Sequence, residues 1–158
     1  MTTTSTRLRD PLRAAGLAAA MLCAGCRYEP LGWWDITELT ATVEGQEPVQ
    51  TDDVGFIQVV DGGQIDALFR VELVATAEGT VALVATEGVA TTTGSWEMDG
   101  KEDFVASIFF GTNQIVLYTD DTTGGSLTLR TDTPADVRDS ANPAAAGVAA
   151  DLSLALER

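Results

Sequence analysis

Apolar and polar residues alternate along most of the chain, in short runs separated by polar breaks. In residues 64–74 (QIDALFRVELV), Ile65 and Leu73 fall on one face, while Asp66 and Glu72 fall on the other. Because successive side chains of a strand point to opposite faces, this period of two predicts a strand with one buried face. The pattern predicts nine strands, at residues 33–43, 54–60, 64–74, 79–87, 94–98, 104–110, 114–119, 126–130 and 152–157.

The breaks between these runs are rich in Gly, Asp and Asn, the residue types that favour turns. Residues 111–113 (GTN), for example, suit a tight hairpin loop. Since short connections favour pairing between neighbours, we expect an all-β fold, an antiparallel up-and-down sheet of about eight or nine strands closed into a barrel. Residues 131–150 form one long connection rich in Ala and Pro, and we expect a mostly disordered loop there.

A different pattern precedes the strands. Arg7, Arg9 and Arg13 give the chain a basic start, and residues 14–25 (AAGLAAAMLCAG) are all apolar or small. This run is too short for a helix that crosses a bilayer, and with its basic flank it predicts a secretory signal over residues 1–25. The alternative is a buried helix of the mature fold, which the lack of an amphipathic period disfavours.

The end of this run carries a recognisable motif. Residues 23–26 (CAGC) resemble the lipobox of bacterial lipoproteins, with Ala24 and Gly25 at the two small positions before the cysteine. Cys23 departs from the motif, because Leu is usual there. The resemblance implies that Cys26 receives a diacylglyceryl group and that residues 1–25 are then removed.

A lipidated Cys26 would anchor an otherwise soluble domain, because two or more acyl chains hold a protein stably on a membrane. Residues 26–31 would be the lipidated start and a short spacer. The resemblance places the chain in the bacterial cell envelope, and Arg27 favours the outer membrane, facing the periplasm. A redox pair of Cys23 with Cys26 is the alternative, but the sequence lacks the βαβ pattern that accompanies such pairs.

The predicted strands carry a second resemblance. Residues 32–34 (GWW) match the G-x-W that opens the first strand of lipocalins. Residues 94–100 (GSWEMDG) carry another G-x-W and look like the middle of small bacterial lipocalin-like domains. The chain therefore resembles a lipocalin-like domain over residues 32–158.

This second resemblance also implies roles for four residues. In lipocalins the first Trp packs at the closed end of the barrel, near an arginine of a late strand. The resemblance assigns Gly32 and Trp34 to that end, with Trp96 in the structural core. Arg130 is the expected arginine, because a guanidinium stacks well on an indole ring.

Charge and composition exclude several functions. Lys and Arg number 9 against 24 Asp and Glu, a net charge of −15, so the chain lacks the basic face that nucleic-acid binding requires. It has no histidine, which removes the commonest general base and metal ligand. We therefore expect no catalytic residue, no cofactor and no metal site. Acidic pairs such as residues 120–121 leave calcium binding or a glycosidase pair as alternatives, but they lack EF-hand spacing.

Two functional hypotheses remain for a barrel on a membrane anchor. In the first, the interior binds a small apolar ligand. In the second, the chain is a non-enzymatic structural or interaction lipoprotein with a filled barrel and a protein partner of unknown identity. Large inward residues such as Phe69, Phe104 and Phe110 decide between them, because an eight-stranded barrel either is filled by side chains or holds one small ligand.

Overall fold

The computed structural model describes residues 30–100 and 103–158, with the backbone alone over residues 87–93. This part of the chain consists of strands and turns. The strands are β1 (Gly32–Thr42), β2 (Val49–Val60), β3 (Gln64–Ala75), β4 (Val81–Asp99), β5 (Asp103–Phe110), β6 (Asn113–Thr123), β7 (Ser126–Arg130), β8 (Ala135–Val137) and β9 (Val148–Glu157). Among the residues described, no helix is long and apolar enough to cross a membrane.

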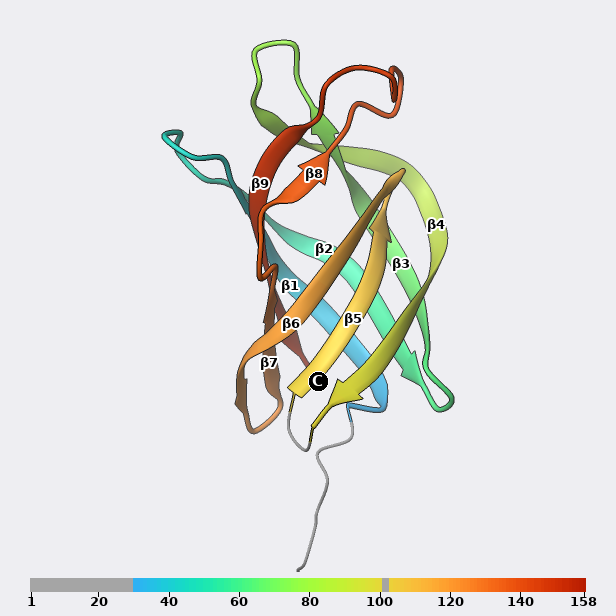
Figure 1. The fold of residues 1–158 in the computed structure, drawn as a ribbon. Helices are drawn as coiled ribbons and strands as arrows, with labels where there is room; N and C mark the ends of the chain where they lie inside the picture. Colours follow the sequence, from blue (N-terminus) through green and yellow to red (C-terminus); the bar gives the residue numbers. More distant parts are fainter. Residues whose placement is uncertain (1–29, 101–102) are drawn as a thin grey trace, which may run out of the picture.

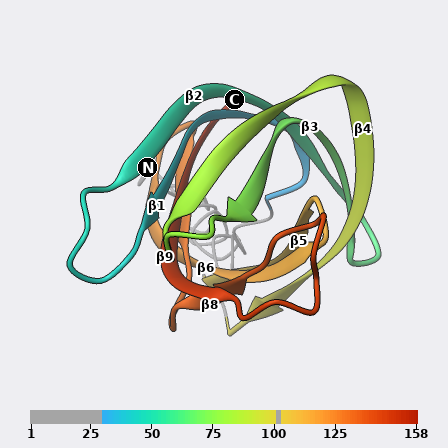
Figure 2. The same cartoon turned by 90° about the horizontal axis from the view of Figure 1, so that it is seen from above.

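The strands close into an antiparallel barrel (Figures 1 and 2). From β1 to β7 each strand pairs with the next along the chain, β7 pairs with β9, and β9 pairs back with β1. β8 is extra, and its ladder runs only to the start of β9. The predicted all-β, up-and-down barrel is thus confirmed, and its eight-stranded wall is consistent with a lipocalin-like barrel.

The barrel interior is lined by the apolar faces that alternation predicted. On β3, for instance, every second residue from Ile65 to Ala75 is buried. The inward side chains of all nine strands form one continuous core. Its largest fully buried members are Trp34, Phe104, Phe110, Ile36, Leu39, Ile57, Ile65, Leu73, Ile108, Ile115, Leu117 and Leu127.

One predicted boundary is wrong. The two strands predicted at residues 79–87 and 94–98 are one strand, β4, which begins at Val81. Phe69 of β3 lies opposite Ala90, whereas Val71 lies opposite Ala85, so β4 carries extra residues at this point. The interruption is a bulge and not a turn, and the β-branched Thr91 to Thr93 that follow suit a continuing strand.

The predicted disorder of residues 131–150 is also wrong, because this segment contains β8. Val137 of β8 is fully buried and belongs to the barrel core. In Figure 1, β8 lies beside the start of β9 near the end drawn uppermost, which we call the upper end. Three residues are too few to show a period, which is why alternation missed this strand.

The opposite, lower end is organised around Trp34. Its ring is 1% exposed, and its Nε1 donates a hydrogen bond to the carbonyl oxygen of Pro30 at 2.7 Å. The guanidinium of Arg158 lies 4.3 Å from the centre of the ring. Arg158 also donates to the carbonyl oxygen of Leu31 at 2.8 Å, so the two ends of the domain are held together here. Gly32 allows the turn into β1, because its φ of +119° is disfavoured for other residues.

Replacing Trp34 with Ala should lower the free energy of unfolding by roughly 3–5 kcal/mol, the range typical of a buried Trp. Equilibrium urea unfolding, followed by intrinsic fluorescence and circular dichroism, measures this loss. Trp33→Ala is the matched control, because that neighbouring ring is 54% exposed. It should change stability by about 0.5 kcal/mol or less. Equal losses in the two variants would show that Trp34 does not anchor the lower end.

Candidate functional site

The second G-x-W motif lies at the same lower end as the first. Trp96 donates from Nε1 to the carbonyl oxygen of Val60 at 2.7 Å, and its ring packs on Phe104 with centres 5.7 Å apart. A Cβ atom on Gly94 would collide with the backbone carbonyl oxygen of Ser107 on β5, so only glycine fits there. Both glycine–tryptophan motifs therefore have structural explanations at the lower end.

The arginine expected over Trp34 is Arg158 and not Arg130. Glu157 of β9 lies opposite Asp35 of β1 on one side and opposite Ser126 of β7 on the other. Since Asp35 follows Trp34 directly, the start of β7 is level with Trp34. Arg130 lies about 13 Å further along the strand, at roughly 3.3 Å per residue. It points outward and forms an ion pair with Asp120 at 2.9 Å. The prediction chose the wrong late arginine because sequence alone does not give the register.

The predicted lipid anchor cannot be placed against this geometry. Cys26 and the signal at residues 1–25 lie outside the described residues. The description begins at Pro30, which contacts Trp34 at the lower end.

The inside of the barrel is the site that a lipocalin-like protein would use for a ligand. Here it is occupied by the protein's own side chains, and Phe69 and Phe110 stack across it with ring centres 4.6 Å apart. Val137 reaches the same core from β8 at the upper end. An eight-stranded barrel of this kind is nonetheless compatible with a ligand-binding lipocalin-like protein.

Asn113 holds the upper end together, and sequence reasoning missed it. This buried side chain donates from Nδ2 to the carbonyl oxygen of Leu73 at 2.9 Å and to that of Arg138 at 3.3 Å. Its Oδ1 accepts from the backbone N–H of Arg138 at 2.7 Å. Asn113 therefore joins β6, β3 and the residue after β8. In the sequence it reads as a turn residue, and nothing there indicates these distant partners.

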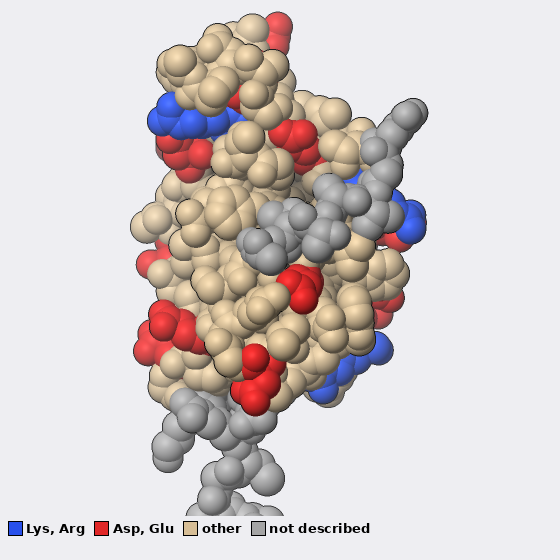
Figure 3. All heavy atoms as spheres, turned by 90° about the vertical axis from the view of Figure 1, so that its right-hand side faces the viewer, with Lys and Arg blue, Asp and Glu red and all other residues tan. Residues whose placement is uncertain are grey.

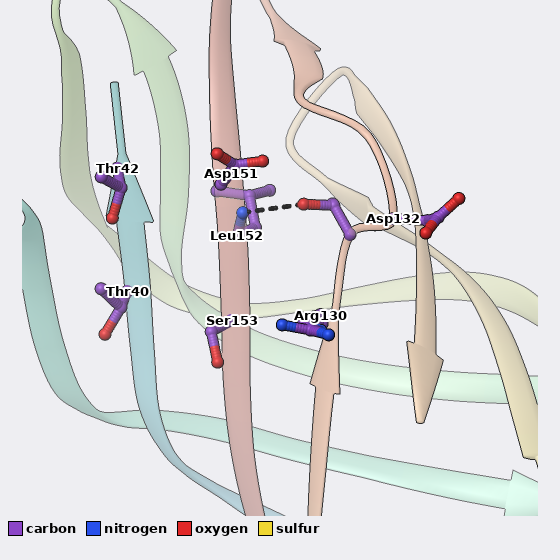
Figure 4. A pocket seen from close by; sticks show the side chains of 8 residues that line it. Thr40, Thr42, Arg130, Asp132, Asp151, Leu152 and Ser153 are labelled. Atoms are coloured by element: carbon purple, nitrogen blue, oxygen red, sulfur yellow. Dashed lines mark hydrogen bonds between the residues drawn. The ribbon is translucent and has the colours of Figure 1, made fainter. Parts of the chain in front are cut away.

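Two hollows lie on the outer wall of the barrel. The first, of about 420 Å³, is shown in Figure 4 and is lined by hydroxyl and charged groups. Thr40 on β1 and Ser153 on β9 flank it, with Asp151 above and Arg130 to one side. The hollow therefore offers hydroxyl, carboxylate and guanidinium groups for binding a polar ligand.

The second hollow, of about 550 Å³, we call the edge slot. One of its sides is β6, from Asn113 to Tyr118, and the other is the segment of residues 131–136. Arg138 lines it at the top, where Asn113 bridges the two sides.

Charge on the surface is mostly negative. The side of the barrel in Figure 3 is largely uncharged, with scattered acidic groups and few basic ones. Among the described residues no group of three or more acidic, His or Cys side chains is placed to hold a metal ion. The three ion pairs found there are substantially exposed, so each contributes little to stability.

Comparison with known proteins adds no family. The chain matches no protein-family model, and neither curated proteins nor solved structures give a significant match.

Replacing Asn113 with Ala should loosen the upper end. The change leaves the buried carbonyl oxygen of Leu73 without this partner, which costs roughly 1–3 kcal/mol, and it also removes the partly buried bonds to the backbone of Arg138. We expect lower stability in urea and faster amide hydrogen exchange in β8. Gln114→Ala is the control, since its side chain makes only an exposed bond to Ser107. Unchanged exchange in β8 of the Asn113 variant would contradict this role.

Proposed function

We propose that the protein is a cell-envelope lipoprotein, anchored through Cys26, whose filled barrel is a non-enzymatic scaffold that presents its outer wall to a protein partner. The observation that carries the scaffold role is the occupied interior. Phe69, Phe110 and Val137 meet in one continuous core. A ligand in that space would have to displace packed side chains. The free energy gained by burying the ligand would first have to offset the cost of that displacement.

The position of Pro30 supports the anchor. Pro30 lies at the lower end, and only residues 27–29 separate it from Cys26. An extended chain spans at most about 3.6 Å per residue, so roughly 14 Å joins the barrel to the lipidated cysteine. Trp33, close to this point, exposes 54% of its surface on the outer wall. An exposed indole suits the water–lipid interface, where Trp is enriched.

Binding of a small apolar ligand inside the barrel is the second candidate. It is favoured by an almost wholly apolar interior and by the shortness of β8, which has three ladder pairs to β9. A ligand would have to enter by moving Val137 aside.

Changing Cys26 to Ser should release the protein from the membrane fraction into the soluble periplasmic fraction, because it removes the site of acylation. Fractionation of cells followed by immunoblotting measures the distribution. Cys23→Ser is the matched control and should remain in the membrane. The anchor assignment is wrong if the Cys26 variant remains there with residues 1–25 already removed, or if only the Cys23 variant is released.

Native mass spectrometry of the released Cys26→Ser protein separates the two candidate functions. The filled scaffold predicts the bare protein mass, even after incubation with an envelope lipid extract. A reproducible added mass that disappears on denaturation would instead identify a cargo and favour the second candidate.

A further inference from the structure

The wall of the barrel has a break in its hydrogen-bonded ladder next to the edge slot. On one side β6 pairs with β5 from Asn113 to Tyr118. On its other side the ladder to β7 ends where Tyr118 lies opposite Arg130. Within the described part of the chain, β8 pairs with β9 alone. Residues 113–117 of β6 therefore lack a ladder partner along one edge.

Such an edge is normally protected. Strand edges carry unpaired N–H and C=O groups, and proteins usually block them with charged residues, proline or a bulge. Residues 113–117 (NQIVL) contain neither a charge nor a proline. What limits access here is the recess itself, since the slot is closed above by the bonds between Asn113 and Arg138 and below by the β6–β7 ladder.

The length of the slot suits a short extended segment. The open part of β6 is about 16 Å long, at roughly 3.3 Å per residue, which suits a strand of about five residues. The slot volume of about 550 Å³ is within the range of sites that hold compact ligands. Because both of its ends are closed, a bound segment must enter from the outer wall and leave with both ends toward solvent.

The side chains beside the slot add apolar contacts. Val116 and Tyr118 line it from β6 and are 44% and 40% exposed. Val105 of β5 lies opposite Tyr118, and Phe109 opposite Gln114, and both are half-buried on the same outer face. Exposed aromatic and aliphatic groups next to a free edge are typical of surfaces that bind proteins.

The charges around the slot favour a basic ligand. Asp132 and Asp136 line one side, and Arg138 is already paired with Asp136 at 2.6 Å. Among the described residues no ion pair involves Asp132, which is exposed. The slot therefore keeps a net negative charge.

We propose that the edge slot binds an extended segment of a partner protein by strand addition to residues 113–117, with a basic side chain of that segment beside Asp132. The backbone edge provides hydrogen bonds, while Tyr118, Val116 and Asp132 select the side chains. The proposal rests on the scaffold role proposed above, but not on lipidation.

The test uses the full chain with Cys26→Ser, and as probe the blocked peptide acetyl-Thr-Val-Lys-Val-Thr-amide. We expect saturable NMR shifts at the amides of residues 113–117, with their hydrogen exchange slowed about tenfold or more at saturation. A peptide with the same side chains but alternate backbone nitrogens methylated cannot complete a ladder, and we expect it not to bind. A peptide with Glu in place of Lys should bind about tenfold more weakly, because like charges then face each other.

Variants of the protein localise the effect. Asp132→Lys should reverse the preference between the Lys and Glu peptides, and Asp132→Asn should abolish it. Asp151→Lys is the matched control and should leave the preference unchanged, because Asp151 is exposed and lines the first hollow only, whereas Asp132 lines both hollows.

Several outcomes would overturn the proposal. These are equal binding of the methylated peptide, shifts confined to interior residues such as Phe69, and no saturable shift at residues 113–117. NMR shifts at residues 113–117 that grow with protein concentration in the absence of peptide would mean that a second copy of the chain fills the edge. That result would also contradict the proposal. A failure of the Cys26 fractionation would refute the anchor without affecting this result, and a cargo in the mass spectrum would refute the scaffold separately.

Discussion

The pairing of the first strand with the last is the constraint on which the rest of this fold depends. The hydroxyl of Thr37 on β1 reaches the carbonyl oxygen of Ala155 on β9, although 118 positions of chain separate them. Without this closure both strands would be open edges and the apolar face of the sheet would be half covered. Contacts between residues so distant in sequence form slowly, because the chain loses loop entropy before it gains the favourable energy of those contacts. Trp34 and Arg158 tighten the same seam at its lower end.

Closure at the lower end is not matched at the upper end. The β7–β9 ladder ends at Arg130 and Thr131 still bonds to Leu152, but the chain then leaves the wall before β8 rejoins β9 at Ala150. The segment from Thr131 to Val137 covers the core at the upper end, because the side chain of Val137 is buried there. It also leaves one edge of β6, the edge that faces away from β5, without a ladder partner over residues 113–117. The cover of the core and the free edge are therefore two consequences of one interruption, and Asn113 limits its extent by bonding across it.

The sequence was informative wherever a period was long enough to read. The alternation in β3 predicted both the strand and its inward face, because register on a half-buried sheet follows the apolar set. β8 was missed since its three residues carry no period, and β4 was predicted as two strands because a bulge interrupts its alternation. The candidate site was less predictable still. Choosing Arg158 over Arg130, or finding the partners of Asn113, needs the register between strands that are distant in sequence.

The two proposals are compatible in space. β9 has ten residues, so with a strand tilt of about 40° the barrel is roughly 25 Å tall. An anchor that reaches at most about 14 Å beyond Pro30 keeps the lower end nearest the bilayer. The edge slot lies between β6 and the segment before β8, toward the upper end. An anchored barrel would therefore hold the slot away from the membrane, and a partner segment would have to approach it from the aqueous side.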